Sequence, residues 1–330
     1  MSNSRPIRRI AIIGTGVIGA SWTALFLAKG LDVIATDVAA NAETSLRSFV
    51  KTAWPALERL GFAAGASQSR LTFASDLKAA VRVADMVQEN GPERIDFKKK
   101  LYRQLDEILP EDVVIASSSS GLTMSEIQSE CRLHPERCVI GHPFNPPHLL
   151  PLVEIVGGAK TSEATIQRIS EFYTGLGKQT VRLRKEVPGH VANRLQAALA
   201  REVYHLVAED VVSVTDVDKA LCWGPGLRWG IMGNVLLNHL GGGEGGIEHF
   251  FRQFTGPMTA WWNVLGSPVL TPELQKKLID GVRAEAGSRS IDELAAIRDE
   301  ILLGLLELRL RAEHAGGRQE VTGLAVSQAR

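Results

Sequence analysis

Two stretches of the chain carry side chains that could move a proton. His142 directly follows the apolar run Cys138 to Gly141, and Glu154 lies in the next such run, Leu152 to Val156. An imidazole oriented by a carboxylate is a good general base, because the carboxylate holds the ring and stabilises its protonated form. Such a pair could take the proton of an alcohol while hydride leaves for an oxidised cofactor. The alternative is a packed structural histidine, which is common before proline.

A glycine-rich turn could hold the cofactor that this chemistry needs. The residues Gly14-Thr15-Gly16-Val17-Ile18-Gly19 directly follow the apolar run Ile10 to Ile13 and open a helical pattern. In dinucleotide-binding turns the first glycine allows the tight turn, the second lets the backbone approach a pyrophosphate, and the third permits close helix packing. The N–H groups of the helix N-terminus then hold the phosphates. We therefore predict that Gly14, Thr15, Gly16, Val17, Ile18 and Gly19 line a dinucleotide site.

An acidic residue selects between the two common dinucleotides. Asp37 follows a second apolar run, Asp32 to Thr36, at about the spacing expected for a residue that binds ribose. A carboxylate accepts from the 2′-hydroxyl of NAD and repels the 2′-phosphate of NADP, and the next residue is Val38 rather than arginine. The sequence predicts NAD. An ordinary glycine turn beside a surface aspartate is the alternative.

The composition excludes several other classes of protein. The 37 basic residues balance 37 acidic ones, so no global field draws the chain to nucleic acid or an anionic membrane. No apolar run approaches the roughly 18 residues of a membrane span, and the polar segment Met1 to Arg9 does not resemble a signal peptide. Cys131, Cys138 and Cys222 share no CxxC spacing. We therefore expect a reduced, cytoplasmic protein without a metal site.

The elements that must position these residues alternate along the first half of the chain. Short apolar runs are separated by helical patterns, which indicates a parallel sheet covered on both faces. The predicted strands are 10–13, 32–36, 86–88, 113–116, 138–141, 152–156 and 180–183. The first helix is predicted from about Ile18 to Lys29. The fold class is therefore α/β: a Rossmann-type doubly wound, mostly parallel sheet followed by an all-α C-terminal domain.

After Pro188 the pattern is helical throughout. Apolar residues recur at helical spacing from Leu195 to Val207, and Ser290 with Glu293 forms a capping box ahead of a long amphipathic helix. The segment 187–189 interrupts both patterns. We predict an NAD-binding domain of residues 1–187 and a helical substrate and dimerisation domain of residues 188–330. The long apolar helix predicts a homodimer through the helical domain.

The order of several motifs resembles the L-3-hydroxyacyl-CoA dehydrogenase superfamily over about residues 8–235. The motifs are the glycine turn, Gln88 to Glu93 with Lys98, Ser117 to Leu122, Gly141 to Pro146, Leu152 to Glu154, and Val187 to Gly189 leading to Asn193-Arg194. The resemblance implies an NAD-dependent oxidoreductase that acts on the CH–OH group of a 3-hydroxy acid.

The resemblance also implies roles for single residues. His142 would be the acid/base and Glu154 its partner, while Ser120 and Asn193 would hydrogen-bond the reacting oxygen, which gains negative charge as hydride moves. The NAD site would be lined by Gly14, Gly16, Gly19, Asp37, Glu93, Lys98, Ser120 and Asn145.

Each of these assignments has a structural alternative. Ser120 could cap a helix that starts at Leu122. The pair Asn193-Arg194 could be an ordinary polar helix start, and Glu93 and Lys98 could belong to a solvated face.

The C-terminal part departs from the CoA-using members of the superfamily. Those carry a lysine-rich helical arm after the second strand, whereas the basic residues of the segment 43–71 are Arg47, Lys51, Arg59 and Arg70. The usual Gly-x-Gly-Phe-Tyr ending is absent. The segments 226–254 and 290–302, with Trp261-Trp262, instead resemble the branch of the L-carnitine dehydrogenases and the λ-crystallin/L-gulonate 3-dehydrogenase proteins. The resemblance favours oxidation of L-carnitine to 3-dehydrocarnitine; L-gulonate and a short 3-hydroxyacyl-CoA such as 3-hydroxybutyryl-CoA are the alternatives.

A trimethylammonium substrate suggests a further set of residues. This soft cation binds aromatic faces, and Trp229, Trp261 and Trp262 are candidates to contact it. Glu244 could add negative charge and Arg228 could hold the substrate carboxylate. Clustered tryptophans are also common in cores and subunit interfaces. In carnitine enzymes a proline separates the two aromatic residues matching Trp261 and Trp262, so a related small hydroxy acid stays open as the substrate.

Two further functions compete with this one. The 6-phosphogluconate-type β-hydroxyacid dehydrogenases share the first domain, but they use a lysine where this chain has Asn193-Arg194. A dinucleotide-binding structural protein, as crystallin relatives illustrate, would be favoured by loss of Ser120, His142 or Glu154. All three are present.

Overall fold

The computed structural model describes residues 5–315, which form two compact units. The first unit contains residues 5–193 together with 297–315, and the second contains residues 194–296. This division differs from the predicted domains 1–187 and 188–330: it comes a few residues later, and most of the C-terminal helix groups with the first unit.

The first unit is built on one eight-stranded sheet with the order β3-β2-β1-β4-β5-β6-β7-β8. Neighbouring strands are parallel, except that β6 and β7 are antiparallel. The strands are β1 Arg9–Ile13, β2 Asp32–Thr36, β3 Leu71–Phe73, β4 Met86–Glu89, β5 Val114–Ser117, β6 Cys138–Pro143, β7 Leu152–Gly157 and β8 Gln179–Arg182. All seven predicted strands are confirmed to within a residue or two at their ends. The sequence analysis missed β3, which has only three residues.

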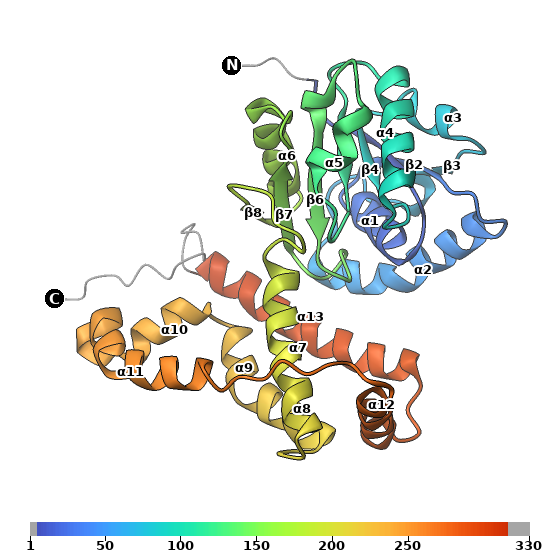
Figure 1. Cartoon of the computed structure of the whole chain (residues 1–330). Coiled ribbons are helices and arrows are strands. Elements are labelled where there is room, and N and C mark those ends of the chain that lie inside the picture. Colours follow the sequence, from blue (N-terminus) through green and yellow to red (C-terminus); the bar gives the residue numbers. More distant parts are fainter. Residues whose placement is uncertain (1–4, 316–330) are drawn as a thin grey trace. The chain divides into compact units, whose positions relative to one another are not determined.

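Helices cover both faces of this sheet (Figure 1). Along β1 the side chains alternate: Ile10 and Ile12 join one buried cluster, and Ala11 and Ile13 join the other. The first cluster packs under α1 Val17–Ala28, α2 Ala42–Leu60 and α6 Glu163–Gly175, and the second under α3 Leu77–Val81, α4 Ile95–Ile108 and α5 Met124–Ile127. Because both faces are buried, central strands such as β1 and β5 are apolar runs without polar alternation, whereas the edge strand β8 is largely polar and exposed.

The strand order reverses between β1 and β4, and the glycine turn lies at this switch point. Open α/β sheets place ligands in the crevice at the carboxyl ends of such strands. Gly14 has φ +82°, and a Cβ there would lie 2.8 Å from the Asn90 carbonyl oxygen. A Cβ on Gly19 would lie 1.9 Å from the carbonyl oxygen of Gly14, whereas one on Gly16 would meet nothing within 4 Å. Gly14 and Gly19 therefore allow backbone segments of the turn to approach closely, and Gly16 leaves free space beside the turn.

The second unit, residues 194–296, consists of helices joined by loops and contains no strand, as predicted. Its helices include the rest of α7 Ala192–Ala208, then α8 Val214–Trp223, α9 Pro225–Trp229, α10 Asn234–Gly241, α11 Gly246–Trp262 and α12 Pro272–Ala286. A small core of Val207, Val214 and Val217 holds α7, α8 and α12 together. The predicted fold class, an α/β sheet domain followed by helices, is confirmed.

The long C-terminal helix, α13 Ile291–Ala315, begins as predicted. The Ser290 N–H donates to Glu293 Oε2 at 2.7 Å and the Glu293 N–H donates to Ser290 Oγ at 3.2 Å, which completes the capping box. In the first unit, Arg59 of α2 pairs with Glu300 at 2.6 Å and Glu307 at 3.0 Å. These ion pairs and the buried Leu303 explain why most of α13 groups with the sheet.

None of the helices described between residues 5 and 315 is both long and apolar enough to cross a membrane.

The turn geometry predicts opposite outcomes for two alanine substitutions. Gly19→Ala should lower the free energy of unfolding by about 3 kcal/mol, because its Cβ would overlap backbone that cannot move without opening the turn. Gly16→Ala, the matched control, should cost less than about 1 kcal/mol because its Cβ enters open space. Denaturant unfolding of both variants measures the difference, and equal losses would contradict this account of the turn.

Candidate active site

The structure brings His142 and Glu154 together. They stand directly opposite each other in the antiparallel pair of β6 and β7. His142 Nδ1 lies 2.8 Å from Glu154 Oε2, and both side chains are buried, with Glu154 only 1% exposed. Because a carboxylate can only accept, Nδ1 carries the hydrogen, and Nε2 keeps a lone pair that can take a proton.

The second oxygen of Glu154 is held by the start of α7. Glu154 Oε1 accepts hydrogen bonds from the backbone N–H groups of Val191 at 2.8 Å and Ala192 at 3.0 Å. Burial alone would raise the pKa of Glu154, but the hydrogen bonds from His142 and from these two N–H groups outweigh it and lower the pKa below its usual range. Glu154 is therefore ionised at neutral pH and can stabilise a protonated His142.

A second carboxylate shapes the turn that carries Ser120. Glu93 Oε1 accepts from the Ser119 hydroxyl at 2.7 Å and from the N–H groups of Ser120 at 3.0 Å and Gly121 at 2.8 Å. Burial raises the pKa of Glu93, but these donors and the Lys98 ammonium lower it overall. The helix that follows begins at Met124 and is capped by the side chain of Thr123, so Ser120 does not cap it. The Ser120 side chain is exposed.

Lys98 lies beneath the loop after β4. Its ammonium is 1% exposed and contacts both oxygens of Glu89 at 2.8 Å. Glu89 also accepts from the Ser117 hydroxyl at 2.6 Å and from the Gly91 N–H at 2.6 Å. A buried ion pair with further hydrogen bonds orders the segments that it joins. Lys98 is therefore not part of a solvated face; here it joins α4 to the ends of β4 and β5.

Asn193 lies next to Ser120. Its side-chain amide donates one hydrogen bond to the Ser120 carbonyl at 3.1 Å. This contact joins the loop after β5 to the start of α7. One of the two amide hydrogens is therefore already used. An ordinary polar helix start would instead direct the side chain to solvent or to its own backbone.

Asn145 is exposed on the loop after β6, and this loop is anchored on both sides. The His148 N–H donates to Ser21 Oγ of α1 at 2.8 Å, while burial lowers the pKa of His148 to about 4 and keeps its ring neutral. The Lys178 ammonium donates to the carbonyls of Pro147 and Leu150. Burial lowers the pKa of Lys178 to about 7. These contacts hold Asn145 near the carboxyl end of β6.

The opposite end of the site fits a dinucleotide. Asp37 Oδ2 accepts from the Thr15 N–H at 2.6 Å and the Thr15 hydroxyl at 3.0 Å, which fixes the carboxylate beside the glycine turn. Burial raises the pKa of Asp37, but its hydrogen bonds lower it overall, so the side chain is an anionic acceptor. Val17 is exposed at the start of α1, and the free space at Gly16 admits a phosphate close to the backbone. The residues present fit NAD.

The predicted substrate residues all belong to the second unit. Arg228 and Trp229 lie on α9, Glu244 lies in the short 3-10 segment Gly243–Gly245, and Trp261 and Trp262 end α11. Trp229 Nε1 donates to Asn234 Oδ1 at 3.2 Å. Within residues 5–315 no ring contact joins these tryptophans, and Trp261 and Trp262 are more than half exposed.

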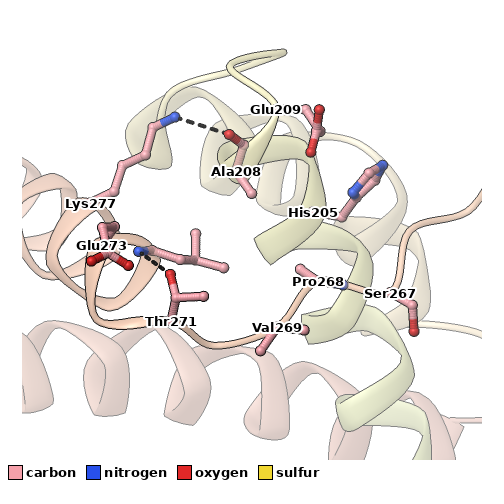
Figure 2. Close-up of a pocket in the computed structure, with 10 residues that line it drawn as sticks. His205, Ala208, Glu209, Ser267, Pro268, Val269, Thr271, Glu273 and Lys277 are labelled. Atoms are coloured by element: carbon pink, nitrogen blue, oxygen red, sulfur yellow. Dashed lines mark hydrogen bonds between the residues drawn. The ribbon is translucent and has the colours of Figure 1, made fainter.

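The second unit also contains a cavity of about 520 Å³. Figure 2 shows it between α7 and the segment that leads into α12, with the Lys277 ammonium bonded to the Ala208 carbonyl. Asp210 already pairs with this ammonium at 2.5 Å. None of the predicted site residues lines the cavity.

The sequence analysis missed one residue of the site. His190 is 2% exposed, and its ring centroid lies 5.1 Å from that of His142. The signal available was a histidine placed directly after Pro188-Gly189 in a segment that leads into a helix.

Comparison with known proteins agrees with this geometry. The family model described as 3-hydroxyacyl-CoA dehydrogenase, NAD binding domain, matches residues 9–187, and the model of the C-terminal domain of the same enzymes matches residues 189–285. An L-carnitine dehydrogenase of Pseudomonas sp. is 49% identical over 91% of this chain and 94% of its own length. One of Streptomyces griseus is 47% identical over 91% of this chain and 89% of its own length.

Solved structures show the same fold. A 5-formyl-3-hydroxy-2-methylpyridine 4-carboxylic acid 5-dehydrogenase, an NAD+-dependent dismutase, superposes with a TM-score of 0.78 at 30% identity, covering 95% of this chain and 100% of that one. The 3-hydroxybutyryl-CoA dehydrogenase of Escherichia coli K12 gives 0.64 at 27% identity, covering 84% and 57%. The resemblance found in the motifs is confirmed. The chain belongs to the 3-hydroxyacyl-CoA dehydrogenase family of NAD-dependent oxidoreductases.

Proposed function

We propose that this protein oxidises the 3-hydroxyl of L-carnitine to give 3-dehydrocarnitine. The buried His142–Glu154 pair at the carboxyl end of β6 carries the chemical part of this proposal. The substrate is suggested by relatives named L-carnitine dehydrogenase, which are 44–49% identical over at least 91% of the chain.

His142 is the general base of the proposed reaction. Its Nε2 takes the proton of the substrate hydroxyl, and Glu154 stabilises the imidazolium that results. NAD, when bound, supplies the hydride acceptor. Ser120 and Asn193 donate hydrogen bonds to the substrate oxygen, which changes its charge as the C–H bond breaks. Asn193 has a second amide hydrogen beyond the one that it gives to the Ser120 carbonyl.

The cofactor residues divide into those that contact NAD and those that order its site. The glycine turn, Gly14 to Gly19, would hold the pyrophosphate and Asp37 the adenosine ribose. Ser120 and Asn145 are exposed on the loops after β5 and β6 and would contact the nicotinamide half. Glu93 and Lys98 order the loops beneath: Lys98 through its buried ion pair with Glu89, and Glu93 through its hydrogen bonds to the serine turn.

The helical unit is proposed to supply the contacts to the rest of the substrate. Trp229, Trp261 and Trp262 offer exposed indole faces for a trimethylammonium group, Glu244 offers a negative charge, and Arg228 offers a guanidinium for the carboxylate. Because the three indoles make no ring contacts with one another among the residues described, each is free to pack on a ligand or on another subunit.

Replacing the proposed base should separate turnover from cofactor binding. His142→Ala should lower kcat on the order of 10²- to 10⁴-fold, while the Kd for NAD changes little because the glycine turn is intact. His134→Ala is the matched control, since His134 pairs with Glu136 before the start of β6 and should turn over normally. NADH absorbance and tryptophan quenching measure the two quantities. Near-normal turnover of His142→Ala would show that the base is misassigned.

A panel of substrates tests the choice of 3-hydroxy acid. We expect NADH formation at alkaline pH with L-carnitine to exceed that with L-gulonate by at least about tenfold in kcat/KM, because only carnitine presents a cation to the indole faces. NADH consumption with acetoacetyl-CoA should be weaker still. A kcat/KM for the CoA thioester far above those for carnitine and gulonate would reverse this ranking.

We further propose that the protein is a homodimer through its helical unit. Large apolar residues that are more than half exposed on this unit include Trp223, Ile231, Val235, Leu240, Trp262, Val264 and Val269. A monomer rarely leaves so many in water. Light scattering at micromolar concentration should give twice the chain mass of 35.8 kDa. A mass of one chain would contradict the proposal.

A cytoplasmic location is also proposed. Cys131, Cys138 and Cys222 are all free thiols, and Cys222 is exposed. Free thiols suit a reducing compartment.

A further inference from the structure

Residues 190–193, which span the start of α7, bind two parts of the candidate active site, and we call this segment the clamp. Its four consecutive residues donate hydrogen bonds to the site: the His190 ring to the Ser119 carbonyl, the Val191 and Ala192 N–H groups to Glu154, and the Asn193 amide to the Ser120 carbonyl. Two of these bonds hold the serine turn, and two hold the partner of His142. The clamp therefore links the two groups that must meet at one substrate oxygen.

His190 occupies the strained position of this clamp. Its φ is +51°, in the left-handed region that non-glycine residues seldom adopt, and it follows Gly189 at φ +77°. Such a backbone persists where surrounding contacts over-determine it, and it is concentrated at functional sites. At His190 the turn directs the next two N–H groups toward Glu154 while the ring reaches back to Ser119.

The two ring nitrogens of His190 have different roles. Nε2 lies 3.0 Å from the Ser119 carbonyl oxygen, which can only accept, so Nε2 carries the hydrogen. Nδ1 is buried and has no hydrogen-bond partner among the described residues. Burial, with the charge of a protonated His142 acting in the same direction, lowers the pKa of His190. His190 is thus a neutral imidazole, and its plane is inclined 51° to that of His142.

We propose that His190 is a positioning residue of the active site: it donates from Nε2 to the Ser119 carbonyl and packs against the His142 ring, and so sets Ser120 relative to His142. The proposal rests on the proposed function of His142 as base. His190 needs no contact with the substrate for this role. Its effect passes through the serine turn on one side and the catalytic imidazole on the other.

Two substitutions separate the hydrogen bond from the bulk of the ring. His190→Phe keeps an aromatic ring beside His142 but removes the Nε2 donor, whereas His190→Gln places an amide N–H where it can reach Ser119. We expect His190→Phe to lower kcat about 10- to 100-fold, as misplacement of a reacting group does, with the Kd for NAD changed less than about threefold. His190→Gln should recover kcat to within about threefold of the wild type.

A control variant and two measurements show whether the losses reflect positioning. The control is Asp210→Gln, which should leave kcat unchanged. Asp210 also has a left-handed backbone, at φ +56°, but lies in the second unit. Nitrogen-15 NMR of the protein without NAD should show His190 protonated at Nε2 and not at Nδ1. Thermal unfolding of all three variants reports the folded fraction at the assay temperature.

The outcomes distinguish this inference from the function on which it rests. No turnover by the wild type with any substrate of the panel would overturn both. Turnover by the wild type with equal kcat in His190→Phe, equal losses in the Phe and Gln variants, or an NMR signal from a protonated Nδ1 would overturn the role of His190 alone. A loss in His190→Phe, its rescue in His190→Gln and an unchanged Asp210→Gln would support it.

Discussion

The buried carboxylate of Glu154 is the constraint on which the candidate active site depends. An ionised group without water is stable only when hydrogen-bond donors surround it. Glu154 meets this need with one donor from β6 and two from the start of α7. The same requirement therefore orients His142 and fixes where α7 leaves the sheet. Removing any donor leaves charge uncompensated, so the catalytic geometry and the local stability cannot be separated.

Carboxylates repeat this role along the carboxyl edge of the sheet. Asp37 accepts hydrogen bonds from the glycine turn, Glu89 pairs with the buried Lys98, and Glu93 accepts hydrogen bonds from the serine turn. Asp37 and Glu89 lie at the ends of β2 and β4, and Glu93 lies in the loop after β4, where loop N–H groups need acceptors. The loops that would contact NAD and substrate are thus held by anions that range from the buried Glu89 to the partly exposed Glu93. This arrangement supplies preorganised groups without depending on loop length or on apolar packing.

The helical unit is held together by a small apolar core. Its own core is small, with Val207, Val214 and Val217 at its centre, and much of its apolar surface is exposed. The proposed contacts to the substrate and the proposed dimer interface both draw on this exposed apolar set. The proposed proton-transfer pair belongs to the first unit and the proposed substrate residues belong to the second, so a substitution in the second unit leaves the pair itself unchanged.

The sequence alone determined seven of the eight strands, the glycine turn, the capping box of α13 and the candidate pair His142 and Glu154, because apolar period, turn chemistry and motif order can be read along the chain. Tertiary structure decided the rest. It placed His142 opposite Glu154 through the antiparallel register, buried Lys98 against Glu89, and brought His190 to the site. It also grouped most of α13 with the sheet. These features depend on which distant segments bury a given group, and burial cannot be known before the chain has folded.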